Sequence, residues 1–161
     1  MSFRPLFMAA AMTAFSLTAT NSLAEGITAR DGWVVMETAK SYAGLIDAVK
    51  TATGANGMGV VTQAGPTKVA AKRGITIPGN QVIGVFNNDF AVKILATSTA
   101  AMIEAPIRIY VTENPDGTAT LAYKTPSHVF APYLDEGGET LAGLAAEMDT
   151  RFAAIADQAT K

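Results

Sequence analysis

The clearest hydrophobic pattern in the chain lies between residues 106 and 124. Apolar residues alternate there with polar or aromatic ones: Ile107, Ile109 and Val111 against Arg108, Tyr110 and Thr112. A period of two is typical of a strand with one buried face. The turn sequence Asn114-Pro115-Asp116-Gly117 follows, and residues 118–124 return with Leu121 and Tyr123 on one face. The segment therefore predicts an antiparallel hairpin.

Two longer segments carry apolar residues at the spacing of a helix with one buried stripe. The first follows Ser41, an N-cap residue, and aligns Tyr42, Leu45, Ile46 and Val49. The last runs from about Glu139 to Gln158 and aligns Leu141, Leu144, Met148, Phe152 and Ile155. Shorter helices are predicted at residues 67–73 and after residues 87–89, where Asn88 or Asp89 caps a helix carrying Phe90, Ile94 and Leu95.

Three further segments are predicted as strands: residues 33–38, 58–63 and 82–86. The last, Val82-Ile83-Gly84-Val85-Phe86, is apolar without alternation, which is expected of a central strand covered on both faces or crossing a tight core. Strands interspersed with helices, together with one antiparallel hairpin, predict an α+β fold. We expect a single antiparallel sheet with the long helices packed on one face.

The first 24 residues have the pattern of a secretory signal peptide. Arg4 supplies a positive charge, residues 6–20 are uncharged, and Ser22-Leu23-Ala24 precedes Glu25, so the predicted cut follows Ala24. The alternative is a membrane anchor, but the uncharged stretch is shorter than the about 20 apolar residues of a spanning helix. We expect a single domain at residues 25–161, located in the periplasm, with no stable membrane span after cleavage.

Composition excludes several classes of function. Removing Arg4 with the leader leaves 11 basic and 14 acidic residues, a net charge of −3, which is not the basic excess of a nucleic-acid-binding protein. The chain has no cysteine and one histidine, His128, and its methionines are scattered, so neither a metal site nor a cofactor is expected. The glycines of residues 54–59 follow a helix, whereas a dinucleotide-binding loop follows a strand.

A few polar residues are candidates for binding. Asn87 and Asn88 stand before a predicted helix, where backbone N–H groups bind an anion or the side chains merely cap the helix. Arg108 and Tyr110 lie on the outer face of the hairpin, which either lines a concave surface or is simply solvated. His128 follows the hairpin as a ligand contact or pH-responsive group, or as a partly exposed loop residue.

From Tyr42 to the last helix, about residues 42–158, the chain resembles the bacterial domain of unknown function 302 family. The motifs that carry the resemblance are Gly57-Met58-Gly59-Val60-Val61, Val82-Ile83-Gly84-Val85-Phe86-Asn87-Asn88, Glu104-Ala105-Pro106, Asp116-Gly117 and Tyr123-Lys124-Thr125-Pro126. The resemblance implies a fold similar to the TATA-box-binding-protein-like architecture, a curved antiparallel sheet with helices on one side. It implies no established activity, and the fold does not imply DNA binding.

The chain departs from the family pattern in two places. Asn87-Asn88-Asp89 stands where relatives often have glycine-asparagine-proline, and Gln63-Ala64-Gly65 stands where many have a histidine. If that histidine binds a ligand in relatives, this protein has lost the ligand or binds it through another group.

Two functional hypotheses follow. The first is a non-enzymatic module that binds a small molecule or a periplasmic protein, working as a homodimer through the exposed sheet or its edge. The second is an enzyme in which Glu104 and His128 converge for general acid–base catalysis near Asn88. The first is preferred because the second needs residues far apart in sequence to meet.

Overall fold

The computed structural model describes residues 26–161, and the predicted signal peptide lies outside the described residues. Five strands are present in this part of the chain: β1 (Trp33–Ser41), β2 (Gly59–Ala64), β3 (Asn80–Phe86), β4 (Ile107–Glu113) and β5 (Thr118–Lys124). The helices are α1 (Tyr42–Ala55), α2 (Thr67–Lys72), α3 (Asn88–Thr97), α4 (Pro126–Phe130) and α5 (Leu134–Thr160). Two short 3-10 turns, η1 (Ala100–Glu104) and η2 (Ala131–Tyr133), precede β4 and α5.

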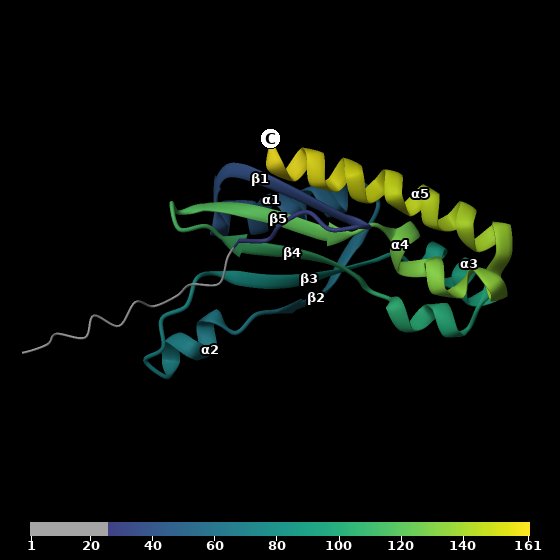
Figure 1. The fold of residues 1–161 in the computed structure, drawn as a ribbon, viewed down its shortest axis with the longest axis horizontal. Coiled ribbons are helices and arrows are strands. Elements are labelled where there is room, and N and C mark those ends of the chain that lie inside the picture. Colours follow the sequence, from purple (N-terminus) through teal and green to yellow (C-terminus); the bar gives the residue numbers. More distant parts are fainter. Residues whose placement is uncertain (1–25) are drawn as a thin grey trace, which may run out of the picture.

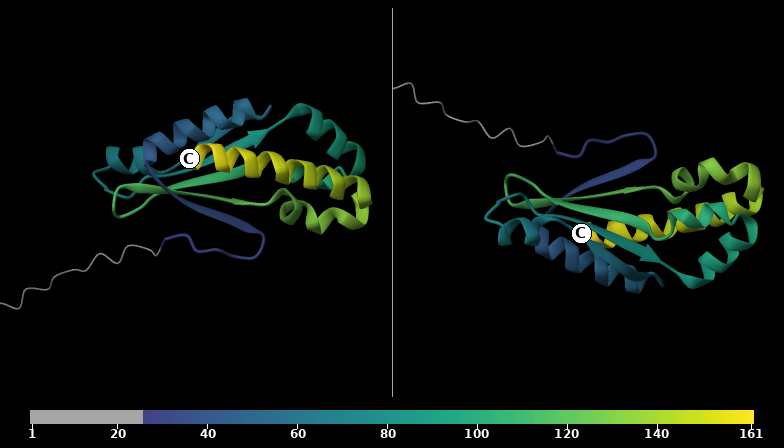
Figure 2. Two further views of the ribbon diagram at one scale, coloured as in Figure 1. Left: turned by 90° about the horizontal axis from the view of Figure 1, so that it is seen from above. Right: turned by 90° about the horizontal axis from the view of Figure 1, so that it is seen from below.

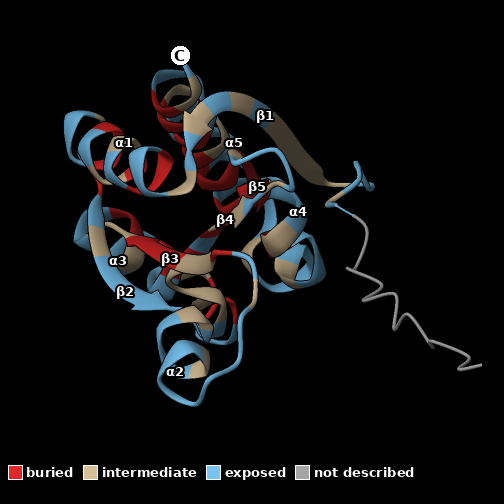
Figure 3. Cartoon of the chain, turned by 90° about the vertical axis from the view of Figure 1, so that its left-hand side faces the viewer, coloured by how far each residue is buried: buried red, intermediate tan, exposed pale blue. Residues whose placement is uncertain are grey.

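The strands form one antiparallel sheet in the order β1-β5-β4-β3-β2. The long helices α1 and α5 lie side by side over one face of it (Figures 1 and 2). The short helix α2 lies on the other side of the molecule from α5, beyond the ends of β2 and β3 (Figures 1 and 3). The predicted α+β architecture, a single sheet with the long helices on one face, is confirmed.

The core lies between the sheet and the two long helices, where Figure 3 shows the buried residues gathered. The apolar residues of β4 (Ile107, Ile109 and Val111) point into it, as their alternation predicts. All five residues predicted for the buried stripe of α5 are buried. Phe152 is fully buried and packs its ring 5.6 Å from that of Tyr123, centroid to centroid. Helix α5 is therefore held against the sheet by the face that the sequence pattern identified.

Two predictions about the strand β3 need correction. It is the second strand from the edge rather than the central one, which is β4, and helices cover only one of its faces. The run lacks alternation because Val82, on the face away from the helices, is half-buried among other sheet residues. Gly84, on the same face, lies close to Thr62 and Pro106, so a polar side chain has no space there.

Helix boundaries differ from the predictions at three points. Asn87, rather than Asn88 or Asp89, caps α3. Thr125 not only ends the hairpin but caps α4, whose Pro126 occupies the first turn, so His128 lies on a short helix and not in a loop. The last helix begins at Leu134, but Gly138 (φ 56°, ψ −150°) interrupts it, and the regular part therefore starts at Glu139 as predicted.

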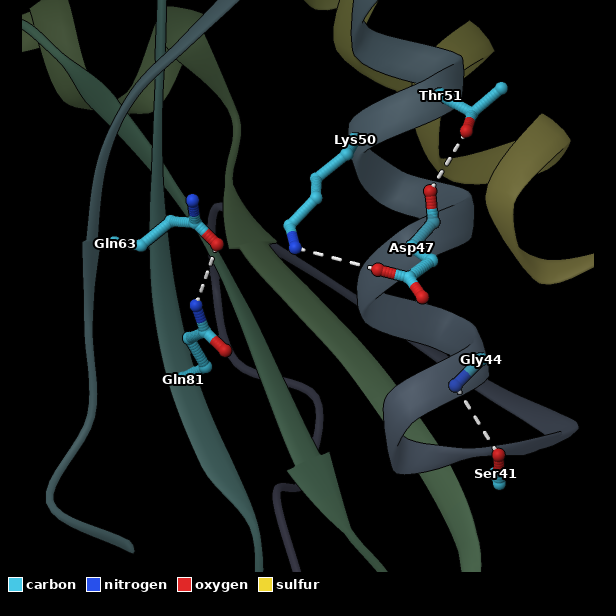
Figure 4. A network of polar contacts seen from close by, with 7 residues as sticks. All are labelled: Ser41, Gly44, Asp47, Lys50, Thr51, Gln63 and Gln81. Carbon is cyan, nitrogen blue, oxygen red and sulfur yellow. Dashed lines mark hydrogen bonds and ion pairs between the residues drawn. The ribbon is translucent and has the colours of Figure 1, made fainter. Parts of the chain in front are cut away.

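Polar contacts at the periphery secure the ends of these elements (Figure 4). Ser41 Oγ accepts a hydrogen bond from Gly44 N at 3.2 Å, which confirms it as the N-cap of α1. At the β2 edge, Gln81 Nε2 donates to Gln63 Oε1 at 2.9 Å and links β3 to β2. The register of β2 with β3 places Gln63 and Gln81 on the same side as Ile83, which is the side that the helices cover.

Candidate functional site

The strand register arranges the open face of the sheet in rows that cross the strands. One row is apolar and spans all five strands, because each member is the register partner of the next: Val35, Ala122, Tyr110, Val82 and Ala64. We call these residues the apolar row. Tyr110 carries the one aromatic ring of this row, with Ala122 of β5 as its neighbour on one side and Val82 of β3 on the other.

The adjacent row carries positive charge. Trp33 of β1 is the register partner of Lys124, and Arg108 of β4 is the partner of Gly84. Continuing the β4–β5 register by one residue beyond the Ile109–Tyr123 pair places Arg108 opposite Lys124. We call Trp33, Lys124 and Arg108 the cationic row. Two residues of like charge therefore occupy neighbouring positions on one side of the sheet, and like charges on opposite positions of adjacent strands are destabilising.

A groove of about 620 Å³ runs over the cationic row and over the apolar row from Ala122 to Ala64, without reaching Val35. It is lined by two cations, three aromatic residues and several small or aliphatic ones, with further residues from the segments next to α2 and α4. The lining residues are Arg108, Lys124, Trp33, Tyr110, Tyr123, Ala64, Gly65, Val82, Ala122, Pro66, Asn80, Glu104, Ile107 and Val129. The volume lies within the about 300–1,000 Å³ of small-molecule sites. Small side chains flanked by larger ones make the hollow, and the sheet beneath gives it a rigid floor.

Neither groove cation is neutralised by a carboxylate in the described part of the chain. The ion pairs within residues 26–161 join Lys50 to Asp47 and Lys161 to Asp157, both on helices. Lys124 Nζ instead lies 5.6 Å from the ring centroid of Trp33, and the guanidinium of Arg30 lies 5.4 Å from the same ring. The indole is thus flanked by two cations, a contact typical of cation–π attraction.

A tyrosine–carboxylate pair stands at the α4 end of the groove. Tyr133 donates its hydroxyl hydrogen to Glu104 Oε1 at 2.8 Å. This hydrogen bond raises the pKa of the Tyr133 hydroxyl, with smaller contributions from burial and from the negative charges of Glu104 and Glu136. One oxygen of the Glu104 carboxylate is therefore already engaged by the protein.

The structure brings together three of the six residues singled out from the sequence. Glu104, Arg108 and Tyr110 all line the groove, whereas Asn87, Asn88 and His128 are not among its lining residues. Asn87 Oδ1 accepts from the N–H groups of Asp89 and Phe90, so it has the capping role that was weighed as an alternative. The ring of exposed His128 lies against Gly32, whose own Cβ, if present, would be 2.1 Å from it.

Sequence reasoning missed Trp33, Lys124 and the alanines of the apolar row. Trp33 lies far from the hairpin in sequence and reaches the groove only through the pairing of β1 with β5. Lys124 follows Ala122 at the period of a strand, so alternation along β5 could have placed it on the same face as Ala122. The alanines contribute by their small size, which no motif signals.

Two other kinds of site were sought in the same part of the chain. Over residues 26–161, no three histidine, aspartate or glutamate side chains come together in a way that could hold a metal ion. No helix in this range has both the length and the apolar character to cross a bilayer.

Comparison with known proteins decides the family. The family model described as "Domain of unknown function DUF302" matches residues 34–159, most of the chain. The chain belongs to the DUF302 family. A comparison of this DUF302 protein with curated proteins found no match.

A solved structure supports the fold of this DUF302 protein. It is similar to the crystal structure of an uncharacterized conserved DUF302 protein from Bacillus stearothermophilus, with a TM-score of 0.70 and 19% sequence identity. The match covers 80% of this chain and 98% of that chain. At this identity the similarity establishes a shared fold and carries no statement about ligands.

Proposed function

We propose that this DUF302 protein is an exported, non-enzymatic binding module and that the groove over the open face of its sheet takes a small molecule. The observation that carries the proposal is the groove itself. Apolar floor, aromatic walls and a few polar groups at defined positions are the usual composition of a small-molecule site. The signal-peptide pattern of residues 1–24 supports a periplasmic location.

The enzymatic alternative has less support. General acid–base catalysis needs its two groups within reach of one substrate. Glu104 lines the groove and accepts a hydrogen bond from Tyr133, whereas His128 is not among the lining residues and packs against Gly32. A binding function needs only the groove, so it is the proposal that the geometry favours.

Recovery of the native protein from periplasmic extract, followed by native mass spectrometry, tests the proposal. We expect a small molecule to co-purify with the wild-type chain and to be absent from the Ala64→Phe variant. Ala64 is exposed at the groove wall, so phenylalanine there fills the groove without entering the core. Recovery from the cytosol with residues 1–24 still attached would refute export, and an empty wild-type chain that also binds nothing in a broad ligand screen would refute binding.

A further inference from the structure

We infer that the groove takes a small organic anion, whose charged group lies between Arg108 and Lys124 and whose apolar body lies on the apolar row. The inference rests on the proposed function and adds the chemical class of the ligand.

Two cations line one part of the groove. Arg108 and Lys124 are exposed and line the same groove, at backbone positions that the β4–β5 register, continued by one residue, places opposite each other. Neither has a carboxylate partner within residues 26–161. Two like charges held together on adjacent strands repel each other. An anion placed between them replaces this repulsion with two attractions, and the planar guanidinium suits a carboxylate or phosphate in particular.

The floor of the groove indicates the rest of the ligand. Next to the cations lie the half-buried side chains of Tyr110 and Val82, which present a ring and an aliphatic group to the groove. A fully inorganic anion would leave this surface uncovered. A ligand with an apolar body covers it and gains from removing that surface from water.

The α4 end of the groove sets the orientation. Glu104 is the carboxylate that lines the groove, and its Oε1 is held by the Tyr133 hydroxyl. Its negative charge disfavours a second anionic group at that end. A ligand with one charged end therefore fits with that end at the cationic row and its body directed along the apolar row toward β3 and β2.

Two matched pairs of probes test the inference: 1-naphthoate against 1-naphthalenemethanol, and octanoate against 1-octanol. Within each pair the apolar body is the same and the negative charge is present or absent. Trp33 is the one tryptophan of the chain and lines the groove, so its single indole N–H signal in an NMR titration reports on this site. Isothermal titration calorimetry supplies the affinities.

We expect at least one acid to bind about tenfold more tightly than its alcohol and to shift the indole signal. Arg108→Gln and Lys124→Gln should each weaken binding of that acid about fivefold, the upper range for an exposed ion pair. Neither should change binding of the alcohol. Lys50→Gln is the matched control, because it removes the same charge from α1 and should leave both affinities unchanged. Added salt should weaken binding of the acid alone.

Several results would overturn the inference. If acid and alcohol bind with equal affinity and Ala64→Phe abolishes binding of both, the groove is a binding site but its ligand is not selected for negative charge. If neither acid binds the wild type, the inference is wrong, and the extract experiment alone then decides the proposed function. A dimer that Ala64→Phe dissociates would assign the groove to a second copy of the chain.

Discussion

The hydroxyl of Tyr133 donates a 2.8 Å hydrogen bond to Glu104 Oε1 and so joins the turn before α5 to the turn before β4. Both turns stand at one end of the groove. The bond requires the tyrosine to keep its proton, since a phenolate has no hydrogen to donate. Loss of that proton would leave two negative charges facing each other.

We therefore predict that Tyr133 ionises above its ordinary pKa of 10.0 and that Glu104→Ala lowers this pKa toward that value. A pKa raised by folding stabilises the native state below pH 10, and this contribution is lost as the pH rises through the folded pKa. An NMR titration of the tyrosine Cζ signals can follow all four tyrosines separately.

The other tyrosines provide the control for this prediction. Burial, followed by other charges, raises the pKa of Tyr42 and of Tyr123, and Glu104 contributes to neither. Both should therefore titrate as in the wild type when Glu104 is replaced. A Tyr133 pKa unchanged in Glu104→Ala would show that the hydrogen bond is not formed in solution.

Asn87 is predicted to stabilise the chain by two separable contacts. Its Oδ1 accepts from Asp89 N at 2.8 Å and Phe90 N at 3.1 Å, and its Nδ2 donates to Gly57 O at 2.8 Å. Loss of the cap alone costs about 0.5–2 kcal/mol, so Asn87→Ala should lower the free energy of unfolding by at least this much in urea denaturation.

Asn87→Asp separates the two contacts. Aspartate keeps the acceptor for the helix N-terminus but has no donor for Gly57. Its loss of stability should therefore be smaller than that of Asn87→Ala. Equal losses in the two variants would mean that the link to Gly57, not the cap, carries the effect.

Asp116 at the tip of the β4–β5 hairpin gives a prediction at acid pH. Its Oδ1 accepts from Thr118 Oγ1 at 2.6 Å and from Thr118 N at 3.0 Å. The hydrogen bond from the Thr118 side chain contributes most, and together with the backbone hydrogen bond it holds the pKa of Asp116 below its ordinary 3.8. A lowered carboxyl pKa stabilises the folded state above pH 3.8, and the contribution is lost as the pH falls through the folded pKa.

Thr118→Val removes the hydroxyl donor and should raise the pKa of Asp116 toward 3.8, as measured by NMR of the carboxyl carbon. The backbone N–H of residue 118 remains, so the pKa should rise only part of the way. A pKa of Asp116 that is the same in both proteins would contradict the assigned cause.

The fold was predictable from the sequence wherever the apolar residues of a single strand or helix recur at regular spacing. The alternation of Ile107, Ile109 and Val111 identified the inner face of β4, and the stripe of α5 identified its buried side. These patterns arise because each element must bury one face against the rest. The break at Gly138 also coincided with the predicted start of the regular helix.

The groove was predictable only in part, because it depends on which strands are neighbours. Arg108 and Tyr110 could be placed on the outer face of the hairpin from alternation alone. Val82, the register partner of Tyr110, and Trp33, the partner of Lys124, come from strands whose order in the sheet is decided by packing of the whole core. A local sequence pattern does not show which strands pair or in which register. Trp33 and Val82 could therefore not be assigned to the groove from the sequence.

Gly84 makes the dependence on register testable. It lies opposite Arg108, and a Cβ added there would be 2.1 Å from Thr62 Oγ1 and 2.7 Å from Pro106 Cγ. Gly84→Ala should therefore destabilise the chain by about 1–3 kcal/mol through overpacking, measured by urea denaturation. Thr62→Ala in the same chain should restore part of the loss, because Pro106 still crowds the new methyl group.

Gly143→Ala is the matched control for this substitution. Gly143 is exposed on α5, and a Cβ there would meet nothing within 4 Å. Alanine is the better helix former, so this variant should gain about 0.5–1 kcal/mol. The same glycine-to-alanine change should therefore raise the free energy of unfolding at position 143 and lower it at position 84. The reason is that β2, β3 and the start of β4 approach one another closely around Gly84. A Gly84→Ala chain as stable as the wild type would mean that the sheet is not packed in this register, and the rows that build the groove would have to be reassigned.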